Sequence, residues 1–246
     1  MKGKKGYRRG YPVALLVGFG DCQAVLWHVF SHVAKLHLKL DLRGKRTDDN
    51  ALYNFHESIV DALKPQLEEG IRSVVVVAPA KTTYSTDFLD HVRKHHAYLT
   101  QQKRLNNVSF VELVGSADQP HSVAELVKTK EFREIVTESN SGEADNLINE
   151  LEKSLSRAAS GSVVLYSLKE IEDSIYNSDG SDESATEYLL LTDRYLADSK
   201  DKSRVHRLLQ ISKNKKVKTR VISAETPAGK RITQMGGIVF FPTQTE

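Results

Sequence analysis

The sequence is poor in cysteine: Cys22 is the only one among 246 residues. A single cysteine excludes an internal disulfide and a cysteine-based zinc site, which is typical of a protein from the reducing cytosol. No stretch approaches the ~18 apolar residues of a membrane-spanning helix. The basic start, MKGKKGYRRGYP, has no small-residue cleavage site and is not a secretory signal. We therefore expect a cytoplasmic protein that does not contact membranes.

Cofactor and metal motifs are also missing. VGFG at 17–20 resembles part of a dinucleotide-binding loop, but a strand follows it where a helix is required, and the third glycine is absent. His91 and His95 have the spacing of a zinc-protease helix, but Val92 stands where that helix needs glutamate. We therefore expect no cofactor, no metal and no catalytic residues, and we interpret His91, His95 and His96 as solvated or RNA-facing.

Charge is nearly balanced overall but unevenly placed. The formal net charge is +3, with 27% charged and 39% hydrophobic residues, as in an ordinary soluble protein. Positive charges gather at residues 2–9, 43–46 and 213–220. Such clusters are typical of contact with polyanions, nucleic acid first. Solvated surface is the alternative interpretation of each cluster.

The first half alternates strands and helices. The expected elements are strands at 11–19, 22–30 and 36–42, a helix at 52–67, a strand at 73–79, a helix at 85–99 and a strand at 106–114. Gly20-Asp21 is a tight-hairpin signal, and Thr47 or Asp48 can cap the first helix. Ser85 or Thr86 can cap the second helix. This order predicts a mixed sheet covered by helices, with Trp27 in or near its core.

The second half has the pattern of a small α/β sandwich. Residues 120–157 are expected to form a polar helical connection broken at 139–142. After it come strands at 162–166, 186–192, 217–223 and 236–241, alternating with helices at 167–177, 203–212 and 224–235. Gly236-Gly237 are expected to permit a tight turn from helix to strand. No repeat of fixed period is present, which argues against a solenoid.

Several segments resemble a known superfamily. SGSVVLYSLKEIEDSI, ATEYLLLTDRYL and RVISAETPAGKRITQMGGIVFFP resemble the C-terminal domain shared by class I eukaryotic-type release factors and Pelota. VVVVAPAKTTYSTDFLDHV is similar to their central domain, and RGKRTDDNALYNFHESIVDAL to Pelota in particular. The resemblance covers residues 12–242. It departs from the family at Tyr166-Ser167, where Tyr-Gly is usual, and at Ala78-Pro79, where Gly-Pro is usual.

The resemblance implies a domain organisation. We expect a basic leader at 1–11, a central domain with an RNase H-like mixed sheet at 12–132, and a C-terminal domain at 133–246. The last would be an α/β/α sandwich similar to kink-turn-binding ribosomal proteins. The N-terminal domain that enters the ribosomal decoding centre in Pelota is expected to be absent.

The resemblance also implies a role for the basic loop that follows the third strand. Arg43, Lys45 and Arg46 are expected to contact RNA phosphates without reading sequence, and Arg8 and Arg9 to act as a further RNA tether. In release factors this connection carries a Gly-Gly-Gln that positions water at the peptidyl-tRNA ester. Residues 42–50 contain one glycine and no glutamine, so we expect no peptide release.

The resemblance therefore predicts a Pelota-like translation factor in ribosome rescue or recycling and mRNA surveillance. Its expected partners are the ribosome with its tRNA and rRNA, an elongation-factor-like GTPase and a subunit-splitting ATPase. Two alternatives remain open: a peptidyl-tRNA hydrolase of the release-factor superfamily without the Gly-Gly-Gln loop, and a stand-alone RNA-binding module.

Overall fold

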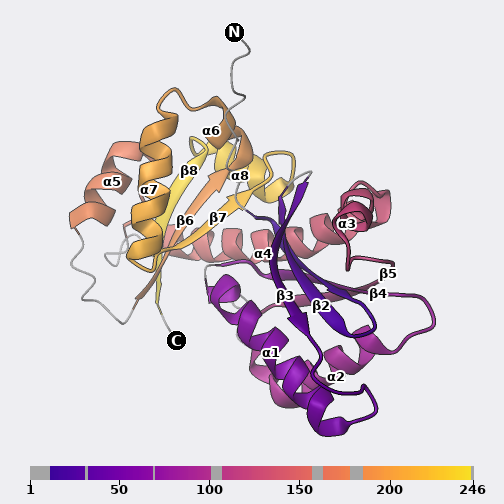
Figure 1. The fold of residues 1–246 in the computed structure, drawn as a ribbon. Helices are drawn as coiled ribbons and strands as arrows, with labels where there is room; N and C mark the ends of the chain where they lie inside the picture. Colours follow the sequence, from indigo (N-terminus) through magenta and orange to yellow (C-terminus); the bar gives the residue numbers. More distant parts are fainter. Residues whose placement is uncertain are drawn as a thin grey trace. The chain divides into compact units, whose positions relative to one another are not determined.

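The chain folds as two compact α/β units, each with its own sheet (Figure 1). The computed structural model describes residues 12–30, 33–68, 70–100, 107–156, 163–177 and 185–244. Described residues up to 137, apart from 65–68, 70 and 107, form the first unit, and the rest form the second. Both units mix strands and helices, which confirms the fold class expected from the sequence.

The first unit is built on a five-stranded mixed sheet in the order β3-β2-β1-β4-β5. Its strands are β1 (Ala14–Phe19), β2 (Gln23–Phe30), β3 (Val33–Asp41), β4 (Ser73–Ala78) and β5 (Ser109–Val114). The first three run antiparallel as a meander, with a register shift between Leu26 and Trp27. β4 then pairs in parallel with both β1 and β5. The hairpin predicted at Gly20-Asp21 joins β1 to β2 and is confirmed.

Helices cover both faces of this sheet. They are α1 (Asp49–Glu68), α2 (Tyr84–His95), the short 3-10 helix η1 (Ala97–Leu99), α3 (Pro120–Leu126) and the first turns of α4 (Lys130–Ser156). On one face, Phe19 of β1 packs against Phe55 of α1 and Phe88 of α2, at ring-centroid distances of 6.3 and 5.6 Å. On the other, Val123 of α3 and Phe132 of α4 join the buried side chains of β1, β2 and β4.

This double cover explains the composition of the inner strands. Every residue of β1 and of β4 is buried, so each reads as a continuous apolar run rather than an alternation. Trp27 is 3% exposed, and its indole N–H donates to the carbonyl oxygen of Ala117 at 2.9 Å. That burial confirms the predicted core position.

The edge strand β3 is different. It pairs only with β2 among the described residues, and most of its side chains are exposed. Leu36 is 59% and Leu38 39% exposed. The apolar–polar alternation therefore predicted the strand correctly, although Leu36 and Leu38 are not part of the core.

The second unit has a three-stranded sheet in the order β7-β6-β8. Its strands are β6 (Ala185–Thr192), β7 (Lys218–Ile222) and β8 (Ile238–Gln244), and its helices are α5 (Leu168–Asn177), α6 (Asp193–Asp198), α7 (Lys202–Asn214) and α8 (Pro227–Gln234), with the later turns of α4. β6 runs parallel to β7 and antiparallel to β8. On one face, Leu147 and Leu151 of α4 and Ile232 of α8 pack on the buried residues of β6 and β8.

A buried ion pair lies within this unit. Arg220 of β7 is 8% exposed, and its Nε donates to the carboxylate of Glu143 on α4 at 2.5 Å. Its Nη1 also donates to the carbonyl oxygen of Thr219 at 2.9 Å. Arg220 is thus a structural cation, although the sequence placed it in an exposed basic cluster.

Several local expectations were wrong. α2 begins at Tyr84, so Ser85 is not its cap; the Ser85 hydroxyl instead donates to Glu112 of β5 at 2.5 Å. α4 runs unbroken through residues 139–142, and the interruption lies between α3 and α4. The strand expected at 162–166 is reduced to a bridge between Leu165 and Phe240. The short helix α6 was not foreseen.

Other local expectations are confirmed. The Asp48 carboxylate accepts from the backbone N–H groups of Asn50 and Ala51, which makes it the cap of α1. Gly236 and Gly237 have φ values of 102° and 85° at the turn from α8 to β8. The expected domain boundary between residues 132 and 133 lies inside α4 and stays a prediction. In the described part of the chain, no helix is long and apolar enough to cross a membrane.

Candidate functional site

The basic loop connects the end of β3 to the start of α1. Leu42 anchors it from below, since its side chain is buried and its backbone N–H donates to the carbonyl oxygen of Cys22 at 2.8 Å. Gly44 has a φ of +129°, a conformation that strongly favours glycine. The N–H of Asp48 then donates to the carbonyl oxygen of Lys45 at 3.0 Å. The loop is therefore short and held by backbone hydrogen bonds near both ends.

Arg46 points back into the protein. Its Nε donates to the carbonyl oxygen of Asp21 at 2.7 Å and its Nη2 to that of Gly20 at 2.6 Å. The guanidinium carbon lies 3.6 Å from the ring centroid of Tyr84, a stacked cation–π geometry. Burial lowers the pKa of Arg46, with the nearby Tyr84 acting in the opposite direction. Arg46 thus ties the β1–β2 hairpin to the start of α2.

Arg43 and Lys45 are not held in this way. Both side chains are exposed, and neither has an ion-pair partner among the residues the structure describes. Two free cations beside a helix start are suited to a phosphate backbone, which is contacted by charge without base readout. Their RNA contact stays a prediction. Arg8 and Arg9 lie outside the described residues.

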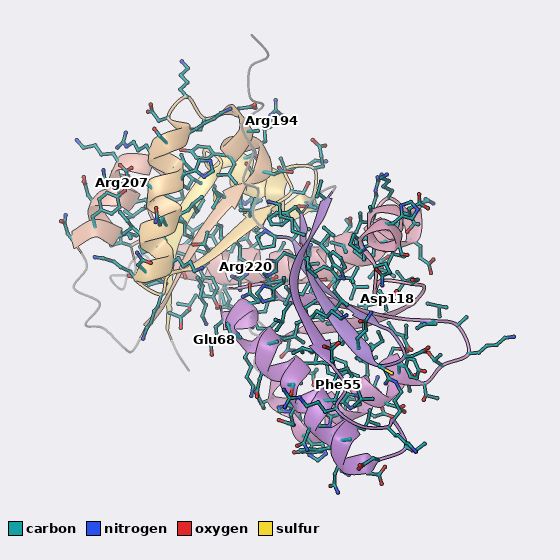
Figure 2. The ribbon with its side chains drawn as sticks, viewed as in Figure 1. Phe55, Glu68, Asp118, Arg194, Arg207 and Arg220 are labelled. Atoms are coloured by element: carbon teal, nitrogen blue, oxygen red, sulfur yellow. The ribbon has the colours of Figure 1, made fainter. Side chains whose placement is uncertain are left out.

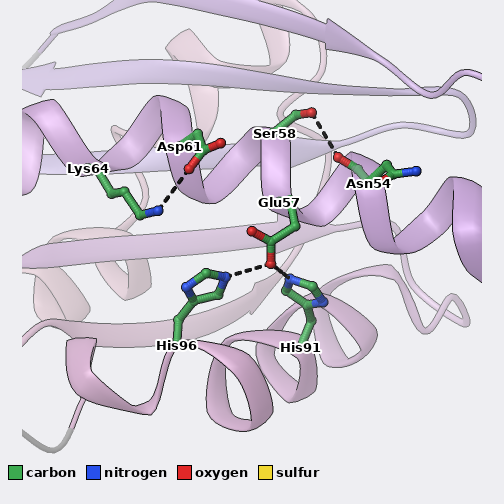
Figure 3. Close-up of polar contacts among 7 residues, drawn as sticks. All are labelled: Asn54, Glu57, Ser58, Asp61, Lys64, His91 and His96. Atoms are coloured by element: carbon green, nitrogen blue, oxygen red, sulfur yellow. Dashed lines mark hydrogen bonds and ion pairs between the residues drawn. The ribbon is translucent and has the colours of Figure 1, made fainter.

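A second constellation lies between α1 and α2 (Figure 3). The Glu57 carboxylate projects from α1 toward two imidazoles. Its Oε1 is 2.9 Å from His91 Nε2 and 2.7 Å from His96 Nε2. The two histidine side chains are 6% and 9% exposed, and that of Glu57 is 28% exposed. These three ligand atoms all lie within 4.8 Å of one another, an arrangement that could hold a metal ion.

The end of α2 makes this convergence possible. Residues five apart on a helix point about 140° away from each other, so His91 and His96 would not meet on a regular helix. However, α2 ends at His95, and His96 leaves helical geometry with φ −128° and ψ 36°. Its backbone N–H still donates to the carbonyl oxygen of Val92 at 2.8 Å, which fixes the turn. The imidazole of His96 is therefore directed back beside that of His91.

Further aromatic rings lie around His91. Tyr53, one turn before Glu57 on α1, lies edge-on to His91 and His95 at centroid distances of 5.0 and 5.1 Å. His56 is 3% exposed among Phe rings, and burial, followed by the charges of His91 and Arg46, lowers its pKa to about 4. His56 is therefore neutral near pH 7.

Electrostatics in the cluster favour an ionised carboxylate. Burial raises the pKa of Glu57, but the hydrogen bonds and charges of His96 and His91 outweigh it, so that the pKa lies below its ordinary value. Burial lowers the pKa of His91, although Glu57 acts in the opposite direction.

The interpretation of these histidines as solvated or RNA-facing is wrong for His91 and His96, because both are buried and paired. For His95 the expected exposure to solvent is confirmed. The sequence offered no direct signal, because Glu57 lies away from the apolar stripe of α1 that contains Phe55, Ile59 and Leu63. Nothing in the spacing fixed where α2 ends, and that end decides the contact.

The sequence was compared with family models and with curated proteins. No family model matches the chain. The Protein pelota homolog of Pyrococcus abyssi is 25% identical over 195 residues, which cover 79% of this chain and 49% of that protein. The homolog of Pyrococcus horikoshii is 26% identical over 195 residues, with the same coverage. The chain is similar to Pelota. This finding confirms the resemblance carried by the sequence motifs.

The Pelota fold is also seen in a solved structure. Ribosome-bound archaeal Pelota, described together with ABCE1, aligns over 99% of this chain and 65% of its own length, with a TM-score of 0.56 and 14% identity. The likeness of fold thus extends over both α/β units. The chain spans about half the length of the curated Pelota relatives that it matches.

Proposed function

We propose that the chain is a Pelota-like translation factor that acts in ribosome rescue or recycling and in mRNA surveillance, in the cytoplasm. The observation that carries the proposal is the similarity to Pelota homologs over 79% of the chain. The archaeal Pelota of the solved structure is ribosome-bound and is described with ABCE1, and we propose a comparable setting for this chain. An elongation-factor-like GTPase completes the proposed set of partners.

The basic loop gives the proposal a contact. Arg43 and Lys45 are exposed and uncommitted, whereas Arg46 is held by the hairpin. We propose that the first two neutralise phosphates of rRNA or tRNA, and that the third holds the loop in shape. Each phosphate contact would contribute a salt-dependent, sequence-independent term to binding.

The same loop argues against peptide release. It is a few residues long, contains Gly44 as its only glycine and has no glutamine. Gly-Gly-Gln chemistry needs a glycine-rich segment that can reach the ester and position water beside it. We therefore propose a non-hydrolytic role.

The test is co-sedimentation of the purified chain with ribosomes on sucrose gradients at several salt concentrations. The gradients are run with and without an elongation-factor-type GTPase and a non-hydrolysable nucleotide. The test variant is the double substitution Arg43→Ala and Lys45→Ala. The matched control is Lys128→Ala with Arg133→Ala, which removes the same charge from an exposed surface of the same unit.

The wild type and the control should co-sediment with ribosomes, and the test variant should bind more weakly. Loss of two phosphate contacts should reduce the slope of log K against log salt by about 1.5. If wild type does not bind ribosomes but binds free RNA, the stand-alone RNA-binding module is correct. Release of peptide from peptidyl-tRNA would instead favour the hydrolase.

A further inference from the structure

We propose that Glu57, His91 and His96 form a binding site for a divalent transition-metal ion, with Zn²⁺ as the reference ligand. The proposal does not depend on the role in translation. It rests on three side chains, from α1, α2 and the residue that follows α2, whose ligand atoms converge within 4.8 Å, and two of these side chains are almost fully buried. Figure 3 shows the carboxylate of α1 directed at both imidazoles.

The donor set is the first argument. Two imidazole nitrogens and one carboxylate oxygen are the protein ligands of many zinc sites in which a water occupies the fourth position. The same set, placed on one face of the metal, is used by non-haem iron proteins. Glu57 is the most exposed of the three ligands, so the fourth position would open toward solvent on its side. A metal-bound water is thus compatible with the site.

The distances are the second argument. Ligand atoms about 2.0–2.1 Å from a tetrahedral zinc lie about 3.3 Å from one another. Oε1 of Glu57 lies 2.9 Å from His91 Nε2 and 2.7 Å from His96 Nε2. Each of these two pairs needs to open by about half an ångström to admit the ion, and the two Nε2 atoms, which lie within 4.8 Å of each other, would take the same spacing of about 3.3 Å. Both Nε2 atoms face the Glu57 carboxylate, so the three side chains would have to shift around the ion without changing their neighbours.

The surrounding charges are the third argument. Lys64, the cation nearest to Glu57 along α1, is paired with Asp61 at 2.8 Å, so it does not occupy the Glu57 carboxylate. Glu57 has no arginine or lysine partner among the described residues. The carboxylate presents a negative charge to a dication, and a carboxylate without an arginine or lysine ion pair favours cation binding.

A metal-free hydrogen-bond cluster is the competing explanation. There, each neutral imidazole donates its Nε2–H to the same carboxylate oxygen, and the cluster merely ties α1 to α2. The two explanations differ in one measurable respect, because only a metal site binds one equivalent of ion with an affinity that depends on all three residues.

The experiment uses the full chain without a histidine tag, stripped with a chelator and titrated with Zn²⁺ against a competing chromophoric chelator. Co²⁺ is titrated separately, and its visible absorption reports coordination. The test variants are His96→Gln, which keeps a hydrogen-bond donor for Glu57, and Glu57→Gln. The matched control is His206→Gln, since His206 is exposed on α7 in the other unit.

Wild type and H206Q should bind one Zn²⁺ per chain and give the intense visible spectrum of Co²⁺ in a low-coordinate site. H96Q and E57Q should each weaken Zn²⁺ binding by about 100-fold or more and lose that spectrum. Absence of stoichiometric binding by wild type would overturn the proposal, as would wild-type affinity in both test variants. If one variant does not fold, the other variant and the wild-type Co²⁺ spectrum still decide.

Discussion

Arg46 allows structural and RNA-binding roles within one loop to be separated. Replacing it with alanine removes two hydrogen bonds from a charged donor, at 2.7 and 2.6 Å, and the stacking on Tyr84 at 3.6 Å. Charge-assisted hydrogen bonds contribute about 1.5–3 kcal/mol each, and a partly exposed cation–π contact about 1 kcal/mol. The conformational entropy lost by ordering the long arginine side chain offsets about 2 kcal/mol of this stabilisation. Because the contact is partly exposed, we take the lower end of these ranges and expect a net loss of about 2 kcal/mol.

The assay is urea unfolding followed by tryptophan fluorescence. Trp27 is the only tryptophan of the chain and is buried in the first unit, so its emission reports that unit alone. With a slope near 2 kcal/mol per molar, Arg46→Ala should lower the urea midpoint by about 1 M. Arg46→Lys should lower it nearly as much, because an ammonium cannot reproduce the forked contact.

Arg43→Ala is the control, since it removes the same charge three residues earlier from an exposed position. It should change stability by less than about 0.5 kcal/mol. An Arg46→Ala midpoint within about 0.2 M of wild type would refute the assignment of Arg46 to the hairpin, at the slope used above. In that case all three cations of the loop would have to be treated as available to RNA.

Two further substitutions, each with a control, test contacts inside the first and the second unit. Gly18→Ala should destabilise the first unit by more than about 3 kcal/mol, because its Cβ would lie 2.0 Å from the backbone oxygen of Ala117. The control Gly115→Ala meets only ordinary contacts and should be tolerated. The Trp27 urea transition measures the stability of both variants. Glu143→Gln leaves the buried Arg220 without its counter-charge and should speed amide hydrogen exchange in the second unit by about 100-fold. The control Glu152→Gln changes a half-exposed residue and should leave exchange unchanged. Unchanged exchange in Glu143→Gln would contradict a stabilising ion pair.

Local chemistry made much of the fold predictable from sequence. The hairpin at Gly20-Asp21, the cap at Asp48 and the buried run of β4 each follow from turn geometry, capping or periodicity, which act over a few residues. The misplaced break at 139–142 has a different cause. Polar residues and one glycine look like a helix end, but Phe132 and Leu147 on either side are buried and keep α4 continuous.

The histidine cluster was missed for a related reason. His91 and His96 are separated from Glu57 by 34 and 39 residues, so their contact depends on how α2 packs on α1. The role of Arg46 was also not visible from sequence, because its partners are backbone carbonyls of another turn. The sequence alone located the three cations of the basic loop. It did not show that Arg46 binds the hairpin while Arg43 and Lys45 stay exposed.

The strand order of the first unit has a consequence for how fast it folds. The meander of β1, β2 and β3 pairs segments that are close in sequence, whereas β1 and β4 pair in parallel across the long connection from Phe19 to Ser73. Closing that connection costs about 2.5 kcal/mol more in chain entropy than closing a three-residue turn. We therefore expect the meander to form early, and the arrival of β4 with α1 to limit the folding rate.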